Sequence, residues 1–219
     1  MSSPLQLPNG LNVSSIKNLI FDLGNVLVKL NQNASAAAEF ERLGATNPEA
    51  RLDNVDLFQT GKLDAQAFRA AVRLSTGLPS SVTDAQFDKA WSAILANFPR
   101  GRLELVQKLR RDSGYKVYVL SNSDTILTER LDKIIDKHHN ERSLDPFFDK
   151  VFYSHEIGHL KPHKPAFMYV IDDLRLVPGE TLLMDDSAEN INAATSCGLQ
   201  AVQIDITTNL NLLSRAPED

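Results

Sequence analysis

The sequence predicts an α/β protein with a Rossmann-like, doubly wound parallel sheet and an inserted helical domain. From Arg102 onward, helix-like and strand-like patterns alternate along the chain. Such alternation is typical of βαβ units that build a parallel sheet. Between about Asn31 and Asn97 the pattern is helical and poor in strands. A chain of 219 residues is long enough for one core domain with an insertion of this kind.

The first strand is expected in the apolar run that starts near Ile16 and ends at Asp22. The inserted segment should then contain helices. Asp64 can cap a helix over 65–74, and Thr83 with Gln86 forms a capping-box pattern for the next one. Two apolar stripes recur at helical spacing: Ala36, Phe40 and Leu43, and then Phe87, Trp91, Ile94 and Leu95. We interpret both stripes as core packing.

The alternating part predicts the remaining elements in order. They are a helix over 103–111, a strand over 116–120, a helix over 125–137, a strand over 151–153, a helix over 165–174, a strand over 181–184, a helix over 188–197 and a strand over 201–204. Gly198 stands where the last helix should stop. The expected division is a core of 14–30 and 97–207, a helical domain of 31–96, and loosely held ends at 1–13 and 208–219.

Composition excludes several classes of protein. The formal net charge is −5 and the chain has no block of Lys and Arg, which argues against a nucleic-acid surface. A single cysteine, Cys197, excludes an internal disulfide and suits a reducing compartment. No signal peptide and no apolar run long enough to span a bilayer is visible. We therefore expect a cytoplasmic protein without nucleic-acid or membrane partners. A monomer is compatible with the sequence, which does not define the oligomeric state.

Polar residues follow four of the strand-like runs. Asp22 ends the first run, Ser121-Asn122 ends a second, Lys161 follows a third, and Asp185-Asp186 ends a fourth. Parallel sheets place their ligands at the carboxyl ends of the strands. A carboxylate, a hydroxyl, an ammonium and a pair of carboxylates are therefore expected to meet in one crevice. Each residue also has a structural interpretation, as a cap, a helix-terminal acid or a solvated lysine.

Four segments carry a resemblance to a known family. They are FDLGNVLV, LSN, GHLKPHKPAF and LLMDDSAENINAATSCGLQAV, in this order. The chain resembles the haloacid dehalogenase superfamily in its phosphatase branch, among the sugar-phosphate phosphatases and similar enzymes with an FDLGNV-type first motif. The resemblance covers all of the chain except its ends, and it places the inserted helices where the family has its cap.

The resemblance implies a Mg²⁺-dependent phosphatase that acts on a small phosphorylated metabolite such as a sugar phosphate. Asp22 would attack phosphorus and form an aspartyl-phosphate. The hydroxyl of Ser121 and the backbone N–H of Asn122 would bind the phosphoryl group, and Lys161 would balance its charge. The expected Mg²⁺ ligands are Asp22, the backbone carbonyl of Gly24, and Asp186, with Asp185 acting directly or through water.

The first motif departs from most of the family at Gly24, where relatives carry an aspartate that acts as general acid and base. Such help is typically worth about 10²–10⁴-fold in rate. The departure keeps one alternative open, a phosphometabolite-binding protein with weakened catalysis. A hydrolytic dehalogenase of the same fold is a second alternative. Two observations argue against the dehalogenase. Halide release needs no metal, which leaves the pair Asp185-Asp186 without a role, and no arginine closely follows Asp22 to bind a halide. Lys29, where close relatives often have an acid, is expected to face solvent.

One competing motif is His155-Glu156-Ile157-Gly158-His159, which fits the H-E-x-x-H pattern of zinc sites. A helix would have to pass through both histidines. Gly158 and the nearby Pro162 argue against such a helix. We therefore expect no zinc site here, and we expect His138-His139 at a solvated loop or helix end.

Overall fold

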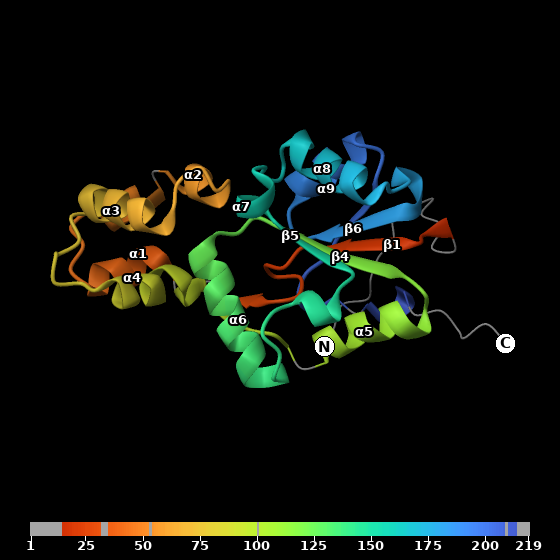
Figure 1. The fold of residues 1–219 in the computed structure, drawn as a ribbon, viewed down its shortest axis with the longest axis horizontal. Coiled ribbons are helices and arrows are strands. Elements are labelled where there is room, and N and C mark those ends of the chain that lie inside the picture. The colour runs from red at the N-terminus through yellow and green to blue at the C-terminus, as the bar shows by residue number, and fades with distance from the viewer. Residues whose placement is uncertain (1–14, 32–34, 53, 100, 209, 214–219) are drawn as a thin grey trace.

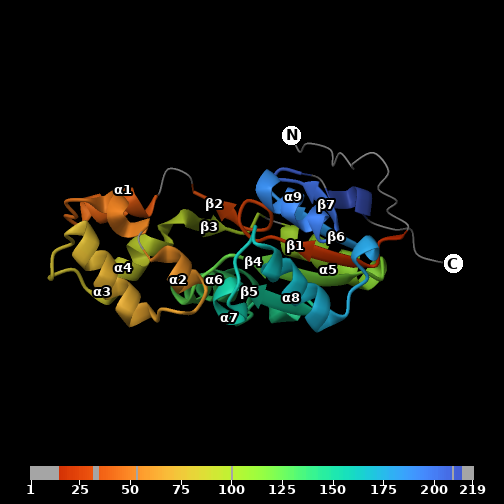
Figure 2. The same ribbon diagram turned by 90° about the horizontal axis from the view of Figure 1, so that it is seen from above.

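The computed structural model describes residues 15–31, 35–52, 54–99, 101–208 and 210–213. A sheet covered by helices forms one side of the molecule, and helices α1 to α4 form the other side (Figures 1 and 2). The sheet has five strands in the order β5-β4-β1-β6-β7, and all of their pairings are parallel. The strands are β1 (Asn18–Phe21), β4 (Lys116–Ser121), β5 (Lys150–Tyr153), β6 (Thr181–Asp185) and β7 (Gln200–Gln203). The predicted α/β class with a doubly wound parallel sheet is confirmed.

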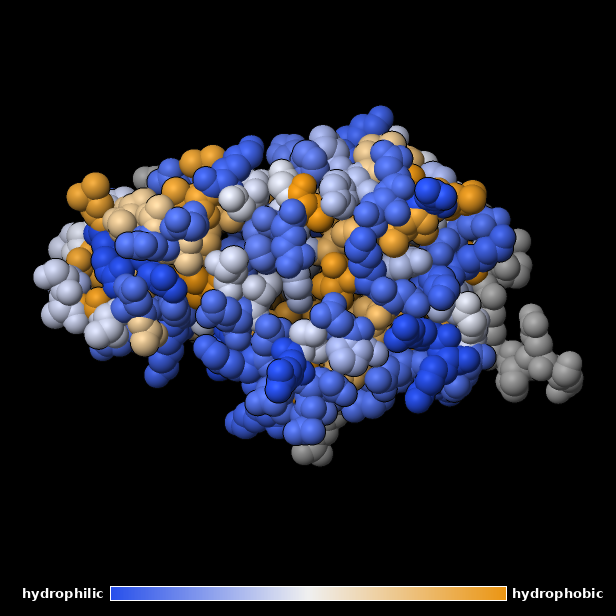
Figure 3. Space-filling view, viewed as in Figure 1, coloured by the Kyte–Doolittle hydropathy of each residue, from blue (hydrophilic) through white to orange (hydrophobic). Residues whose placement is uncertain are grey.

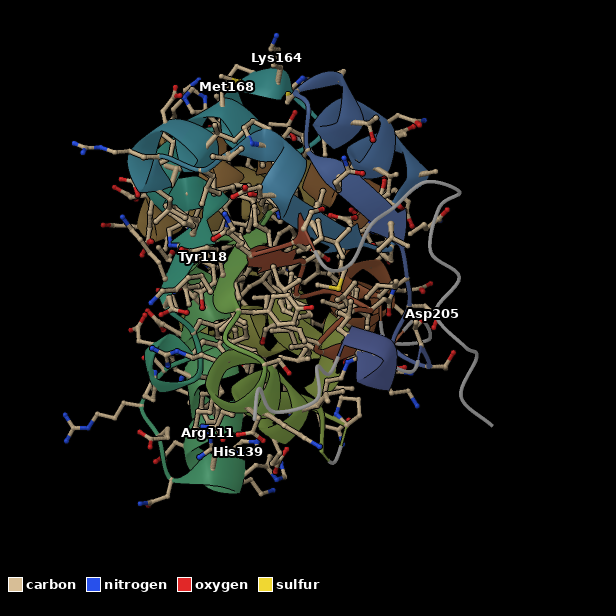
Figure 4. The ribbon with its side chains drawn as sticks, turned by 90° about the vertical axis from the view of Figure 1, so that its right-hand side faces the viewer. Arg111, Tyr118, His139, Lys164, Met168 and Asp205 are labelled. Atoms are coloured by element: carbon tan, nitrogen blue, oxygen red, sulfur yellow. The ribbon has the colours of Figure 1, made fainter. Side chains whose placement is uncertain are left out.

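Helices cover both faces of the sheet. On one face lie α5 (Arg102–Asp112) and α6 (Thr125–His139), and on the other lie α8 (Lys164–Leu174) and α9 (Ala188–Ser196). Figure 4 shows these layers, with Arg111 and His139 below the sheet and Lys164 and Met168 above it. Alternate residues of β1 serve the two faces. Leu19 and Phe21 pack towards α5 and α6, while Ile20 packs towards α8. All three are buried, as expected for a strand covered on both sides.

The inserted segment is built from four short helices around a cluster of aromatic rings. Its helices are α1 (Ala36–Arg42), α2 (Val55–Gln59), α3 (Ala65–Thr76) and α4 (Asp84–Trp91). The 3₁₀ helix Pro48–Leu52 lies between the first two. Asp64 caps α3, and Thr83 with Gln86 forms the predicted capping box of α4. Phe68 stacks on Phe58 and lies edge-on to Phe87 and Trp91. These helices therefore have a hydrophobic cluster separate from those of the sheet.

Two short strands join the inserted helices to the core. Strand β2 (Lys29–Leu30) leaves the core, and β3 (Leu95–Asn97) returns to it in antiparallel pairing with β2. The prediction that Ile94 and Leu95 continue the apolar face of the preceding helix was wrong. Helix α4 ends at Trp91, and Ile94 lies in a 3₁₀ turn. The pairing between β2 and β3 joins residues that are distant in sequence, so a local periodicity does not reveal it.

Among the described residues, the inserted helices touch the core at α6 (Thr125–His139) and at α7 (Ser154–Ile157). The indole Nε1 of Trp91 donates a hydrogen bond of 3.0 Å to Oδ2 of Asp124, which is buried and caps α6. On the other side, the turn after α2 approaches α7 (Ser154–Ile157). Gly61 has φ +69° there, and a Cβ built on it would lie 2.2 Å from the carbonyl oxygen of His155. Only a glycine fits so close an approach in a left-handed conformation.

The chain end after β7 packs against the core as far as the structure describes it. Leu210 and Leu213, in the 3₁₀ helix Leu210–Leu213, are fully buried in the cluster beneath β1. Arg102 holds this stretch by donating to the carbonyl oxygens of Thr208 and Asp205. The expectation of a loose end from residue 208 was therefore wrong for 208 and 210–213. The other expected loose end, 1–13, lies outside the described residues.

The surface seen in Figure 3 is mainly hydrophilic, with apolar side chains in small separate patches. Large exposed apolar side chains include Leu57 on α2, Leu74 on α3 and Val177 in the loop after α8. Among the described residues, no helix is both long and apolar enough to cross a membrane. Most of the buried apolar side chains belong to three hydrophobic clusters in the interior.

Candidate active site

Three neighbouring strands bring the predicted site residues to one edge of the sheet. β1 lies between β4 and β6, with Phe21 in register with Val119 and Met184. Asp22 extends this ladder by one step, because its N–H donates to the carbonyl oxygen of Met184 over 2.9 Å. Asp185 is the last residue of β6, and Ser121 is the last residue of β4. The parallel pairing thus explains why residues so distant in sequence lie together.

Lys161 lies between two of the carboxylates. Its Nζ is 2.7 Å from Oδ1 of Asp22 and 2.6 Å from Oδ2 of Asp185, and only 1% of its side chain is exposed. Asn122 fixes the main chain of Lys161 from both sides. It accepts from the N–H of Lys161 over 2.9 Å and donates to its carbonyl oxygen over 2.7 Å. The ammonium therefore has a defined position, which a solvated lysine does not.

Asp185 and Asp186 have different surroundings. Asp185 is fully buried, and Lys161 occupies its Oδ2. Its Oδ1 accepts from the N–H of Ser187 and from the side chain of Asn190, each over 2.9 Å. Asp186 is only partly buried and accepts from the side-chain amide of Asn25 over 3.1 Å. Asp186 therefore retains more freedom to bind a ligand, while Asp185 is held by donors on both oxygens.

Asn25 and Asn190 were not singled out from the sequence. Asn25 lies in the turn after Asp22 with φ 52°, a conformation that asparagine adopts more readily than most residues. Asn190 lies in the first turns of α9, five residues after Asp185. A polar amide in the first turn of a helix that follows a strand-end carboxylate is the signal that would have found it.

The three carboxylates make a site for a cation. Asp22, Asp185 and Asp186 each offer an oxygen, and these oxygens lie within 4.8 Å of one another. With three carboxylates and the single ammonium of Lys161, the ionised site carries two uncompensated negative charges. Adjacent carboxylates repel one another unless a cation lies between them. A hard divalent cation with oxygen ligands fits this donor set in charge and chemistry.

Burial changes the titration of the site in the absence of a cation. It raises the pKa of Asp22 from 3.8 to about 6, against the lowering effect of Lys161, and the charge of Asp185 adds to the rise. Burial also acts to lower the pKa of Lys161, but the charges of Asp22 and Asp185 outweigh it and hold that pKa above its usual value. Lys161 is therefore charged, and Asp22 is the carboxylate that a cation would help to ionise.

Position 24 has no acid, and its geometry shows what occupies the space. Gly24 does not adopt a left-handed conformation, since its φ lies outside the positive range. A Cβ built on it would lie 3.2 Å from Cδ1 of Leu30 and 3.7 Å from Oδ2 of Asp22. The side chain of Leu30 thus crowds the place where a residue at position 24 would begin. Backbone strain does not require a glycine here.

The structure also places Ser121, Lys29 and the pair His138-His139, for which the sequence made separate predictions. Ser121 is buried at the site, and its hydroxyl makes only a long contact of 3.5 Å to the carbonyl oxygen of Asn122. Lys29 is exposed, as expected. His138 is exposed and His139 ends α6, with its ring edge-on to Phe147.

The H-E-x-x-H segment does not form the continuous helix that this type of zinc site needs. The helix α7 includes His155 but ends at Ile157, and Gly158 turns the chain with φ 75°. His155 contacts the carbonyl oxygen of Ser123, whereas the ring of His159 lies near Tyr169. Within the part of the chain that the structure describes, the group of side chains placed so that it could hold a metal ion contains no histidine. The helix break that the sequence predicted is thus confirmed.

Comparisons with known proteins agree with this geometry. A family model described as haloacid dehalogenase-like hydrolase matches residues 16–198. A D-ribitol-5-phosphate phosphatase of Bacteroides thetaiotaomicron is 30% identical over 195 residues, which cover 86% of this chain and 91% of that protein. A sesquiterpene phosphatase of Aspergillus oryzae is 24% identical over 191 residues, which cover 87% of this chain and 91% of that protein.

A solved structure also matches. A HAD family enzyme from Bacteroides thetaiotaomicron, in complex with magnesium and inorganic phosphate, superposes with a TM-score of 0.81 and 30% identity. The match covers 91% of this chain and all of that one. The family model spans most of the chain, and the fold and the strand-end residues agree with it. The chain therefore belongs to the haloacid dehalogenase-like hydrolase family.

Proposed function

We propose that this enzyme is a Mg²⁺-dependent phosphatase that hydrolyses a small phosphorylated metabolite through an aspartyl-phosphate at Asp22. The observation that carries the proposal is the buried Lys161, which bridges Asp22 and Asp185 beside the partly exposed Asp186. Relatives named as phosphatases support it. A solved relative that holds magnesium and inorganic phosphate supports it as well.

The first step follows from the placement of Asp22. A carboxylate oxygen of Asp22 attacks phosphorus, the bond from phosphorus to the ester oxygen breaks, and the leaving group departs with the electron pair. Oδ1 of Asp22 is bound to Lys161, so its other oxygen, Oδ2, is the one that faces position 24. In the second step, water attacks the phosphorus of the acyl phosphate, which releases inorganic phosphate and regenerates Asp22.

The other residues neutralise and bind the phosphoryl group. Lys161 offsets negative charge, and the hydroxyl of Ser121 with the N–H of Asn122 donates to phosphoryl oxygens. The side chain of Asn122 adds a role that the sequence did not predict, because it fixes the main chain of Lys161. We also propose that 31–96 acts as a cap on a core of 14–30 and 97–207.

Mg²⁺ would be held by Asp22, Asp186 and the carbonyl oxygen of Gly24. Bound there, it would supply positive charge to the nucleophile and the phosphoryl group, which otherwise repel each other. Asp185 would act on it through water, because Lys161, Ser187 and Asn190 already occupy both of its oxygens. Its main role would then be to position Lys161.

The test is turnover of p-nitrophenyl phosphate and acetyl phosphate by the purified protein, with Mg²⁺ and with a chelator. We expect hydrolysis that needs Mg²⁺ and that Asp22→Asn removes. Chloride release from a 2-haloacid without metal would favour the dehalogenase instead. Three carboxylates around one ammonium would repel a halide and a haloacid, which argues against that alternative. Phosphate binding without any turnover would favour the binding protein.

A further inference from the structure

An apolar pocket opens beside the strand-end residues. It has a volume of about 190 Å³ and lies between the first turn of the core, the two joining strands and α6. Its lining residues are Leu23, Gly24, Val28, Leu30, Ile94, Leu95, Ser121, Asn122, Ser123, Leu127 and Leu131. None of them is ionisable. The pocket therefore contrasts with the charged cluster of Asp22, Lys161, Asp185 and Asp186 next to it.

The pocket is continuous with the place where a phosphoryl group would lie. Gly24, Ser121 and Asn122 belong both to its wall and to the proposed phosphate site. A Cβ built on Gly24 would lie 3.7 Å from Oδ2 of Asp22 and 3.2 Å from Cδ1 of Leu30, so Gly24 lies close both to the nucleophile and to the pocket wall. A group bonded to a phosphorus atom near Oδ2 of Asp22 can therefore extend past Gly24 into the pocket.

Apart from the hydroxyl of Ser121, which the proposed mechanism assigns to the phosphoryl group, and the hydroxyl of Ser123, the pocket has few polar groups to offer a leaving group. The amide of Asn122 is bonded at both ends to the main chain of Lys161. The N–H of Ser123 donates to the hydroxyl of Ser154, and its carbonyl oxygen accepts from that hydroxyl. A ligand with several hydroxyls would lose hydrogen bonds to water on entering and would regain few of them. An apolar group would lose none.

We propose that this pocket holds the leaving group of the substrate, and that the leaving group is apolar and about the size of a six-membered ring. The proposal rests on the proposed phosphatase function and specifies its substrate class. The volume is consistent with this size, since an apolar cavity of about 150 Å³ binds benzene. The half-buried residues Leu30 and Leu95 of the joining strands, Ile94 of the 3₁₀ turn before β3 and Leu127 of α6 would contact it.

The experiment compares cyclohexyl phosphate with inositol 1-phosphate, which share a six-carbon ring and differ in five hydroxyl groups. The hydroxyls make the inositol oxygen the better leaving group, so leaving-group ability alone would favour inositol 1-phosphate. A preference for cyclohexyl phosphate must therefore come from the pocket. We expect kcat/KM to be higher for cyclohexyl phosphate by at least about 10²-fold, the discrimination that an apolar pocket exerts against one added hydroxyl. Cyclohexylphosphonate should also inhibit the unmodified enzyme more strongly than inorganic phosphate does.

A variant with a matched control locates the preference. Leu127→Asn should lower kcat/KM for cyclohexyl phosphate by about tenfold or more, since each lost methylene contact changes affinity by about fourfold. The ratio of kcat/KM for cyclohexyl phosphate to kcat/KM for inositol 1-phosphate should decrease. Leu174→Asn is the control, because Leu174 is also half-buried on a helix but packs against the opposite face of the sheet. It should leave the ratio unchanged.

The outcomes separate this inference from the function on which it rests. Mg²⁺-dependent turnover that prefers inositol 1-phosphate, or that treats both substrates alike, would overturn the apolar leaving group and leave the phosphatase standing. Should Leu127→Asn fail to fold, the comparison of the two substrates and the phosphonate inhibition on the unmodified enzyme still decide. Absence of Mg²⁺-dependent turnover with every phosphate tested, acetyl phosphate included, would overturn both proposals.

Discussion

The cluster at the strand ends consists of charged side chains, whereas the pocket beside it is lined mainly by apolar ones, and the two come largely from different parts of the fold. The cluster of Asp22, Lys161, Asp185 and Asp186 lies at the ends of the core strands and in the loops that follow them. The pocket takes most of its apolar wall from the joining strands and α6. Our proposals assign the reaction to the charged cluster, and the choice of ester to a wall that the core shares with the connection to the inserted helices.

The largest effect is expected from the proposed nucleophile, Asp22. Asp22→Asn should reduce phosphatase turnover to background, because an amide is a poor nucleophile of nearly the same shape. The variant should fold, and the apolar pocket should still bind cyclohexylphosphonate in a thermal-shift assay. Residual turnover in a variant verified by mass spectrometry would show that another residue attacks phosphorus.

The next effect concerns the missing acid at Gly24. We expect phenyl phosphate to be cleaved at least about 10²-fold faster than cyclohexyl phosphate in the chemical step, because only the phenolate departs readily without a proton. Both leaving groups have a six-membered apolar ring, so the pocket treats them alike. Single-turnover rates measure the difference.

The structure also shows how to restore an acid. Gly24→Asp alone places a Cβ 3.2 Å from Leu30, so Leu30→Ala should accompany it. The double variant should cleave cyclohexyl phosphate faster and reduce its disadvantage against phenyl phosphate. Leu30→Ala by itself is the control and should not reduce that disadvantage. Similar chemical-step rates for both esters in the unmodified enzyme would mean that another residue supplies the proton.

A smaller effect is expected from the proposed metal ligand Asp186. Asp186→Ala should raise the Mg²⁺ concentration for half-maximal activity by at least about tenfold, the loss typical even of groups that only support a metal ligand. Asp172→Ala, at an exposed position on α8, should leave the Mg²⁺ requirement unchanged. An unchanged requirement in both variants would remove Asp186 from the metal site.

The core was more predictable from the sequence than the connection to the inserted helices. Apolar strands that end in Asp22, Ser121 and Asp185 follow each other in one chain order, and parallel pairing then brings their ends together. The family motifs indicated which of these residues to combine. Each strand is covered on both faces, so its buried pattern is strong in the local sequence.

The connection carried weaker signals. Strands β2 and β3 are two and three residues long, and they pair across the whole inserted segment. Leu95 therefore looked like a further residue on a helix face. The crowding of Gly24 by Leu30 has the same origin, because it arises between residues whose contact the turn and the joining strand create. The apolar pocket could not be predicted for this reason.

A further effect concerns the pH dependence of stability without metal. The folded pKa of Asp22 is raised from 3.8 to about 6, chiefly by burial. The folded protein thus holds a proton that the unfolded chain releases, so metal-free stability falls as pH rises from about 4 to 6 and levels off above. Asp22→Asn removes this loss, which is on the order of 3 kcal/mol. We expect the variant to melt above the metal-free wild type at pH 7 and near it at pH 4.

The chelated proteins should be compared by calorimetry across this range, with Asp172→Asn as the exposed control. A wild type that gains stability over Asp22→Asn as pH rises would contradict the raised pKa. It would also show that the ion pair with Lys161 outweighs the burial of Asp22.

The smallest effect tests whether the contact between the inserted helices and the core controls the pocket. Gly61→Ala would place a Cβ 2.2 Å from the carbonyl oxygen of His155, so the two parts must move apart. His155 contacts the carbonyl oxygen of Ser123, a residue of the pocket wall. We expect kcat/KM for cyclohexyl phosphate to fall several-fold, with little change for acetyl phosphate, whose small leaving group does not need the pocket.

Gly114→Ala is the matched control, because Gly114 has φ +67° against +69° for Gly61, and a Cβ there would meet nothing within 4 Å. Both variants carry the cost of a left-handed alanine, roughly 1–2 kcal/mol, and the clash with His155 adds to it only in Gly61→Ala, so the melting temperature should fall in both variants and further in Gly61→Ala. Only Gly61→Ala should also change the preference for the leaving group. An equal preference in both variants would mean that the pocket is shaped by the core and the joining strands alone.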